Sequence, residues 1–179
     1  MRRVPALTIV LLAVMRLSPV GAQTPDFSGT WVLDRGASEI SEAAGLAVLG
    51  AVDAPERLHV THAANGDLAL QSEWNTSEAR VFRPGRETVI PVGPDDTLAV
   101  TSRWEGDTLV AEGRRERAGG GSSILGVRRA ISLSPDGAHL TIEATTTTAE
   151  GSATSRLVYG RLRDLGPCEL WSEPCTPRR

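Results

Sequence analysis

Hydrophobic and polar residues alternate with a period of two over most of the chain after residue 23, and turn residues interrupt the alternation at short intervals. Leu58, Val60 and His62 alternate in this way up to Asn65-Gly66, a pair typical of a two-residue hairpin turn. Segments of this kind span residues 29–33, 57–62, 68–74, 78–83, 87–92, 98–104, 108–117, 124–133, 139–147 and 154–162. The pattern predicts about ten strands joined almost entirely as hairpins.

One segment, Ser38 to Leu49, has helical instead of strand periodicity. Ser38 is suited to cap the N-terminus and Gly50 to end the helix. The apolar stripe consists of Ile40, Ala44, Ala47 and Val48. Because Gly45 weakens this helix, we expect it to form only where a surface is available to pack against.

These elements together predict an all-β fold. We expect an antiparallel up-and-down β-barrel of about 8–10 strands, with one short helix after the first strand that covers one mouth. Closure into a barrel removes exposed sheet edges, which favours it over the alternative, a sandwich of the same strands.

The first twenty-two residues differ from the rest and resemble a secretory signal peptide. Arg2 and Arg3 are followed by a short apolar run from Ala6 to Leu12, and small residues stand at Val20-Gly21-Ala22. The run is too short to span a bilayer. The chain therefore divides into a signal peptide (1–22), a barrel domain (23–165) and a C-terminal tail (166–179), and we expect a periplasmic or secreted protein.

Charge and cysteine content narrow the picture further. The formal charge is −3, and removal of three leader arginines makes it −6, which argues against nucleic acid as a partner. The two cysteines, Cys168 and Cys175, both lie in the tail. In an oxidising compartment they are expected to form a disulfide.

The segment Asp26-Phe27-Ser28-Gly29-Thr30-Trp31-Val32-Leu33 resembles the opening strand of lipocalin-like secreted bacterial proteins. Gly29-x-Trp31 also matches the lipocalin signature, and residues 103–109 and 133–140 are further, weaker similarities. The resemblance implies a barrel around a cavity that holds a small apolar molecule. It also implies structural roles for Gly29 and Trp31 and an arginine over Trp31: Arg161, with Arg163 or Arg156 as other choices. Lipocalins usually have eight strands, whereas about ten strands with an early helix are more similar to the fatty-acid-binding relatives of the lipocalins.

Arginine placement gives the candidate site. Arg129 shares a strand face with Val127, Ile131 and Leu133, so it points where the core should be. Tyr159 and Arg161 share a face of the last strand. The fatty-acid-binding barrels hold a carboxylate with an inward Arg-x-Tyr pair and another arginine, so the resemblance implies a ligand site at Arg129, Tyr159 and Arg161. The alternatives are that Arg129 reaches water or pairs with Glu112 or Glu143, and that Arg161 only covers Trp31.

The sequence contains no catalytic constellation and predicts no cofactor. The nucleophile elbow G-x-S-x-G is absent, and the Gly119–Ser122 segment lies between strands, where a hairpin loop is the simpler interpretation. His59 and His62 are three apart on a strand and point to opposite faces, which disfavours a metal site. We therefore expect no enzyme.

Two functions remain: a binder of a small hydrophobic or acidic ligand, and a periplasmic protein-interaction or inhibitor module without a ligand cavity. Fold alone does not separate them. A ligand-sized cavity would favour the binder, and a barrel filled with side chains would favour the module.

The leader predicts that the mature chain begins at Gln23, because Val20 and Ala22 are the small residues that a signal peptidase reads. N-terminal sequencing of the exported protein checks this. A start beyond Phe27 would mean that the cleavage site is misplaced, and an uncleaved Met1 would contradict export.

Overall fold

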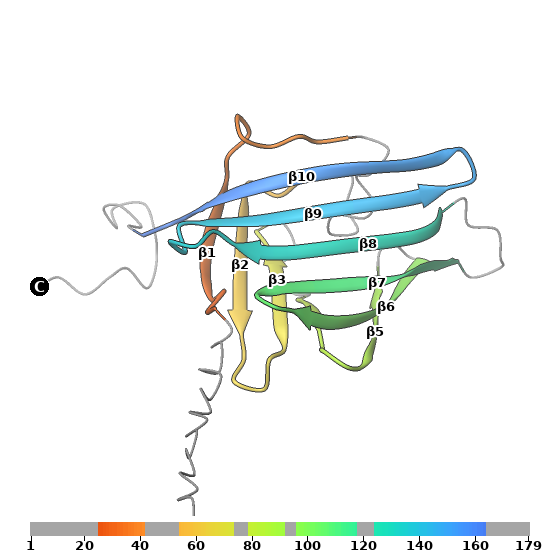
Figure 1. The fold of residues 1–179 in the computed structure, drawn as a ribbon, viewed down its shortest axis with the longest axis horizontal. Helices are drawn as coiled ribbons and strands as arrows, with labels where there is room; N and C mark the ends of the chain where they lie inside the picture. Colours follow the sequence, from red (N-terminus) through yellow and green to blue (C-terminus); the bar gives the residue numbers. More distant parts are fainter. Residues whose placement is uncertain (1–24, 42–53, 74–78, 92–95, 118–123, 164–179) are drawn as a thin grey trace, which may run out of the picture.

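In the computed structural model of this chain, the described residues are 25–41, 54–73, 79–91, 96–117 and 124–163. They form a nearly closed, ten-stranded antiparallel barrel (Figure 1). The strands are β1 (Gly29–Leu33), β2 (Arg57–His62), β3 (Leu68–Ser72), β4 (Arg80–Phe82), β5 (Glu87–Pro91), β6 (Asp96–Glu105), β7 (Thr108–Arg117), β8 (Ile124–Leu133), β9 (His139–Thr148) and β10 (Gly151–Arg161). The predicted all-β, up-and-down fold is confirmed, and the strands lie close to the predicted ranges.

The strand order is β4-β3-β2-β1-β10-β9-β8-β7-β6-β5, so every neighbour but one is also a neighbour in sequence. The exception is β1 beside β10, which joins the two ends of the strand series through the pairs Trp31–Arg161, Val32–Gly160 and Leu33–Tyr159. β4 and β5 lie at the two ends of the sheet. An isolated bridge between Pro84 and Ser102 links the two sides there.

The strands are unequal in length. β1 to β5 contain three to six residues each, whereas β6 to β10 contain ten or eleven. The long strands form one continuous wall that β5 extends beside β6, and β1, β2 and β3 run across the direction of the long strands (Figure 1).

Inward residues of the strands form the core, as the period-two pattern predicts. Trp31, Leu58, Leu68, Phe82, Leu109, Ile131, Leu140, Ile142 and Leu157 are each 0 % exposed. One end of the interior is filled by the rings of Phe27, His62 and Trp104, whose centroids lie 5.4–5.7 Å apart. Trp104 therefore acts as a hydrophobic plug.

The hairpin at Asn65-Gly66 is longer than predicted. The amide of Gly66 donates to the Ala63 carbonyl and that of Ala63 to the Asp67 carbonyl, so the loop has three residues. Gly66 adopts a φ of 84°, which disfavours residues with a side chain.

The predicted start of the helix at Ser38 is wrong. The Ser38 hydroxyl accepts a hydrogen bond from the Val158 amide (2.9 Å), and Glu39 exchanges two backbone hydrogen bonds with Arg156. β10 is six residues longer than β1, and residues 38–41 satisfy its remaining edge instead of beginning a helix. The rest of the predicted helix, from residue 42 to Leu49, lies outside the described residues.

Two other predictions, the signal peptide (1–22) and the disulfide between Cys168 and Cys175, also concern residues outside the described ranges. No helix in the part of the chain that the structure describes is long and apolar enough to cross a membrane.

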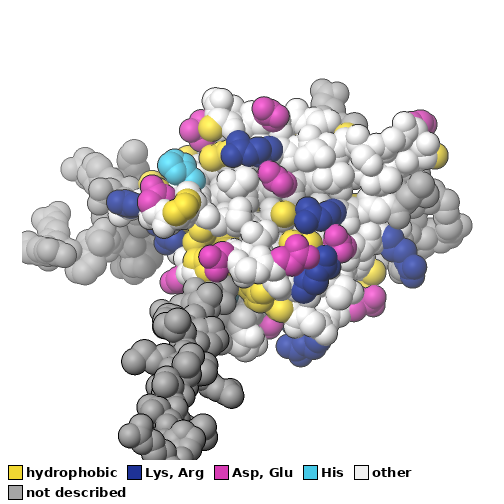
Figure 2. Space-filling model, viewed as in Figure 1, with side chains coloured by type: hydrophobic (Ala, Val, Ile, Leu, Met, Phe, Trp, Pro, Cys, Tyr) yellow, Lys and Arg dark blue, Asp and Glu magenta, His cyan; other side chains and the backbone are white. Residues whose placement is uncertain are grey.

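The outer surface of the long-strand wall carries charges of both signs, interspersed over the face shown in Figure 2. Glu112 lies on this outer side and binds Arg103 (2.8 Å) and Arg128 (3.2 Å). The proposed alternative partner of Arg129 is thus engaged with other arginines outside the barrel.

Gly113 of β7 is expected to tolerate no side chain. A Cβ atom at this position would lie 1.8 Å from the Ala99 carbonyl oxygen of β6, which is backbone and cannot move aside. We expect Gly113→Ala to lower the free energy of unfolding by about 2 kcal/mol or more, in the range of severe overpacking. Thermal denaturation followed by circular dichroism measures the loss.

Gly126→Ala on β8 is the matched control, because its nearest atoms would lie 3.9 Å from the new Cβ. Equal melting temperatures for the two variants would contradict the close approach of β6 and β7.

Candidate functional site

A row of inward residues that crosses the long-strand wall contains Arg129 and otherwise only small side chains. Strand register places Ser102, Ala111, Arg129, Ala144 and Ser155 side by side on β6 to β10. We call this row the Arg129 layer. The residues in register with Arg129 on both neighbouring strands, Ala111 and Ala144, are thus alanines.

The Arg129 side chain is buried, with 1 % of its surface exposed. Its Cζ atom lies 5.7 Å from the centroid of the Phe82 ring on β4, so the side chain spans the interior from the long-strand wall to the short-strand side. Burial, and then the positive charge of Arg80, lowers the pKa of Arg129 to about 9. Desolvation of a cation is costly, so a buried guanidinium marks a candidate binding group.

Three buried hydroxyl groups lie in or next to the Arg129 layer. Ser102 belongs to the layer, while Thr88 and Thr146 lie in the adjacent row of Thr88, Val100, Gly113, Val127, Thr146 and Ala153. Ser102 and Thr146 are each 1 % exposed and Thr88 is 6 % exposed. None of the three hydroxyl oxygens has a hydrogen-bond partner among the described residues. Each is therefore able to donate a hydrogen bond to a ligand.

Ser155, in the same layer, is engaged. Its hydroxyl accepts a hydrogen bond from the Ser41 amide (2.9 Å) and contacts the Ser41 carbonyl (3.3 Å). Ser155 thus fixes the extended segment 38–41 against β10, instead of contributing a donor to the interior.

Tyr159 is also inside the barrel, with 0 % of its surface exposed and no hydrogen-bond partner for its hydroxyl among the described residues. Burial raises its pKa, so the phenol stays protonated and can donate. However, Tyr159 does not belong to the Arg129 layer. It is in register with Leu33 on β1 and Leu140 on β9, and Leu140 is in register with Leu133 on β8. Tyr159 is four positions along the strand from Ser155 in the Arg129 layer, about 14 Å at roughly 3.4 Å per residue.

The row between these two layers consists of Leu109, Ile131, Ile142 and Leu157, which are aliphatic, and of Trp104 at its β6 end. Arg129 and Tyr159 are therefore both inward, as predicted, but they lie at opposite sides of an aliphatic row. A single small head group is not expected to contact both.

Arg161 has the structural role that the lipocalin resemblance implies. Its guanidinium lies over the Trp31 ring, with Cζ 4.3 Å from the centroid. The same group donates to the carbonyls of Gly137 (3.0 Å), Ser28 (2.8 Å) and Asp26 (3.1 Å). With its donors occupied in this way, Arg161 holds the barrel end closed.

Gly29 takes part in this closure. A Cβ atom there would lie 3.2 Å from the Arg161 Nη1 atom, and Gly29 has a φ of 145°. The Trp31 indole N–H donates to the Phe27 carbonyl (3.1 Å). The structural roles predicted for Gly29 and Trp31 are consistent with these contacts.

Sequence reasoning identified Arg129 but missed Thr88, Ser102, Thr146 and the nearby Arg80. A signal for the hydroxyls was present, since Ser102 stands between Val100 and Trp104 on an inward face. Inward parity locates such residues on the inner wall, but it does not show which residues of other strands lie at the same height.

The histidines do not form a metal site. His59 faces outward, where its Nδ1 atom lies 3.0 Å from the Thr30 hydroxyl, and His62 packs on Phe27. No group of three or more histidine, cysteine, aspartate or glutamate side chains suited to a metal is found within residues 25–163 as far as they are described.

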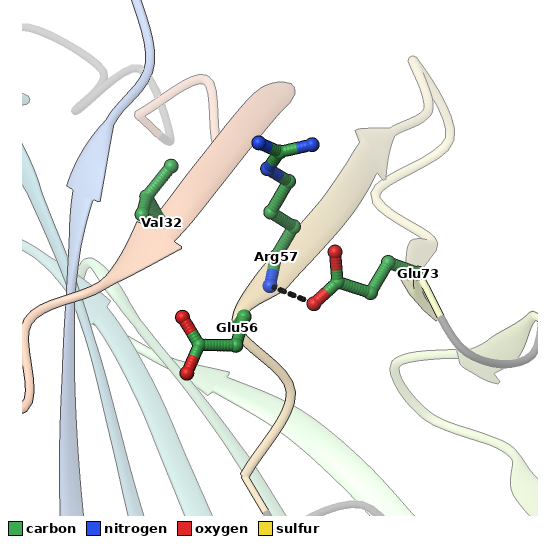
Figure 3. Close-up of a pocket in the computed structure, with 4 residues that line it drawn as sticks. All are labelled: Val32, Glu56, Arg57 and Glu73. Atoms are coloured by element: carbon green, nitrogen blue, oxygen red, sulfur yellow. Dashed lines mark hydrogen bonds between the residues drawn. The ribbon is translucent and has the colours of Figure 1, made fainter.

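A separate groove of about 420 Å³ lies on the outside of the barrel and is lined by Val32, Glu56, Arg57 and Glu73. Figure 3 shows the two carboxylates on either side of the start of β2, where the Arg57 amide donates to Glu73 (3.1 Å). Glu56 also binds Arg35. Both carboxylates of the groove are therefore engaged with neighbouring residues.

The fold is similar to that of several solved β-barrels whose descriptions name fatty-acid or bile-acid binding. A structure described as "REP1-NXSQ fatty acid transporter" superposes with a TM-score of 0.53 at 14 % identity, over 75 % of this chain and 95 % of that one. Fatty-acid-binding protein 1 of Echinococcus granulosus gives 0.52 at 17 % identity, over 76 % and 97 %. The zebrafish ileal bile acid-binding protein complexed with cholic acid gives 0.50 at 15 % identity, over 76 % and 98 %.

At these identities the similarity establishes the architecture and not a shared activity. No protein-family model matches the sequence. No curated protein matches it either.

Proposed function

We propose that this protein binds a small amphipathic acid, with the acidic group at Arg129 and the apolar part inside the barrel. The observation that carries the proposal is the burial of Arg129, at 1 % exposure, beside two alanines and three hydroxyls without hydrogen-bond partners among the described residues. An anion at this position would compensate the cost of a desolvated guanidinium with charge-assisted hydrogen bonds.

The rest of the interior suits the apolar part of such a ligand. The adjoining row of Leu109, Ile131, Ile142 and Leu157 is aliphatic and fully buried. Proteins with the same architecture include ones described as a fatty acid transporter and as a bile acid-binding protein with cholic acid, which supports a ligand of this class. Together with the leader sequence, this suggests a carrier or sensor that works in the periplasm or outside the cell.

The proposal predicts that Arg129→Leu weakens binding of decanoate by about 1–3 kcal/mol, the value of a hydrogen bond to a charged group. Isothermal titration calorimetry of the full chain measures the affinity. Arg128→Leu is the matched control, because Arg128 precedes Arg129 on β8 but is exposed and pairs with Glu112 outside the barrel. Unchanged affinity in Arg129→Leu, or an equal loss in both variants, would refute a carboxylate site at Arg129.

Affinity should also depend on pH through Arg129. Below about pH 9 the guanidinium is charged in the free protein, so affinity for decanoate is expected to be constant. As the pH rises through about 9, the free protein loses this proton, binding must take it up again, and affinity falls by up to about tenfold per pH unit. Tyr159 stays protonated over this range because its pKa is raised.

Calorimetry at intervals between pH 7 and pH 10.5 gives the profile, and Arg129→Leu should abolish its descending limb. A descending limb that persists in Arg129→Leu would assign the titration to another group.

A further inference from the structure

The interior around Arg129 contains more hydrogen-bond donors than the two coplanar oxygens of a carboxylate can accept from. Ser102 lies on β6, two strands from Arg129 on one side. Thr146 lies on β9, the neighbouring strand on the other side. Thr146 is diagonal to Arg129, because it lies two residues beyond the paired Ala144, which places the two Cα atoms about 7–8 Å apart. Thr88 adds a third hydroxyl from β5.

A second cation contributes from the opposite side of the barrel. Arg80 of β4 lies close enough to Arg129 to act on it electrostatically, and its Nε atom is buried. The guanidinium of Arg129 itself reaches the same strand, at Phe82. Besides Arg129 on β8, the interior therefore contains buried hydroxyls on β6 and β9, on either side of β8, and a second guanidinium on β4; Thr88 on β5 is three strands from β8.

Head groups differ in how many acceptors they present and in which directions. A carboxylate has two oxygens, which lie in one plane with its carbon. A phosphate or sulfate ester has three terminal oxygens that point in three directions, and a phosphate monoester has up to two negative charges near neutral pH. Hydroxyls on both sides of Arg129, at Ser102 and Thr146, together with two arginines match the second kind of group.

We propose that the head group bound in the Arg129 layer is a tetrahedral oxyanion ester, a monoalkyl phosphate or sulfate, with Ser102 and Thr146 as its hydroxyl donors. This rests on the binding function proposed above and specifies its ligand class. The alkyl part lies along the aliphatic row that contains Ile131 and Ile142.

The test compares four amphiphiles of equal chain length at pH 8: decyl phosphate, decyl sulfate, decanoate and decanol, each titrated into the full chain by calorimetry. Decyl phosphate and decyl sulfate should each bind at least about tenfold more tightly than decanoate, as expected for one added charged hydrogen bond. Decanol should bind least tightly. The ratio between the two esters then distinguishes a dianionic phosphate source from a monoanionic sulfate source.

Two variants assign the preference to the hydroxyls. Thr146→Val and Ser102→Ala should each reduce the ratio of ester to carboxylate affinity by about tenfold, while decanoate affinity changes less. Thr141→Val is the matched control, since Thr141 lies on the same strand with the opposite parity and faces outward. Melting temperatures report on folding, and removal of a buried hydroxyl without a partner should leave them unchanged or higher.

Decanoate that binds as tightly as both esters, or an affinity ratio that is the same in Thr146→Val and Ser102→Ala as in the unaltered protein, would overturn the tetrahedral head group while leaving the carboxylate function intact. Failure of all four amphiphiles to bind would instead overturn the proposed function itself.

Discussion

The joint between β1 and β10 is the contact on which the barrel depends. Without it, the sheet would separate into a short-strand part, β1 to β4, and a part from β5 to β10 that contains the long wall. The joint has only three paired positions, so strand pairing contributes little. Arg161 supplements it, because one guanidinium covers Trp31 and also donates to carbonyls in the segment before β1 and in the turn before β9.

Arg129 and Arg161 both lie on the inward faces of their strands, but their surroundings in the barrel differ. Arg161 is at the end of the barrel, where backbone carbonyls are available and part of the side chain is accessible. Arg129 is in the middle of the wall, where its register neighbours are alanines and 1 % of its surface is exposed. The first position favours a structural role, and the second keeps a charge in an apolar interior at a cost that binding would offset.

Most of the fold could be predicted from the sequence, because the alternation that defines each strand is local. The first strand, Gly29–Leu33, and the inward orientation of Arg129 both follow from parity within one strand. The extended conformation at Ser38 could not be predicted in this way, since it depends on the unpaired edge of β10, which is distant in sequence.

The prediction that Arg129 and Tyr159 share one site was wrong for a related reason. Parity gives the face on which a side chain lies, whereas its height in the barrel depends on the register between strands. Register accumulates through every turn, and turns such as the one at Asn65-Gly66 differ in length from what their residues suggest. The same limit concealed Ser102 and Thr146, whose proximity to Arg129 is a property of five strands together.

The side of the barrel between β4 and β5 has a consequence for how a molecule reaches the interior. β4 has three residues and three paired positions with β3, and across the gap the Gly85 amide bonds the Ser102 carbonyl (2.8 Å). Because so few backbone hydrogen bonds hold β4, we expect it to open locally at a small fraction of the free energy of global unfolding. Amide hydrogen exchange measures this opening. Phe82, which contacts Arg129, lies on β4, so each opening of this seam would also hydrate the buried guanidinium. Entry of a ligand through this seam would therefore coincide with hydration of the guanidinium, and closure of the seam with its desolvation.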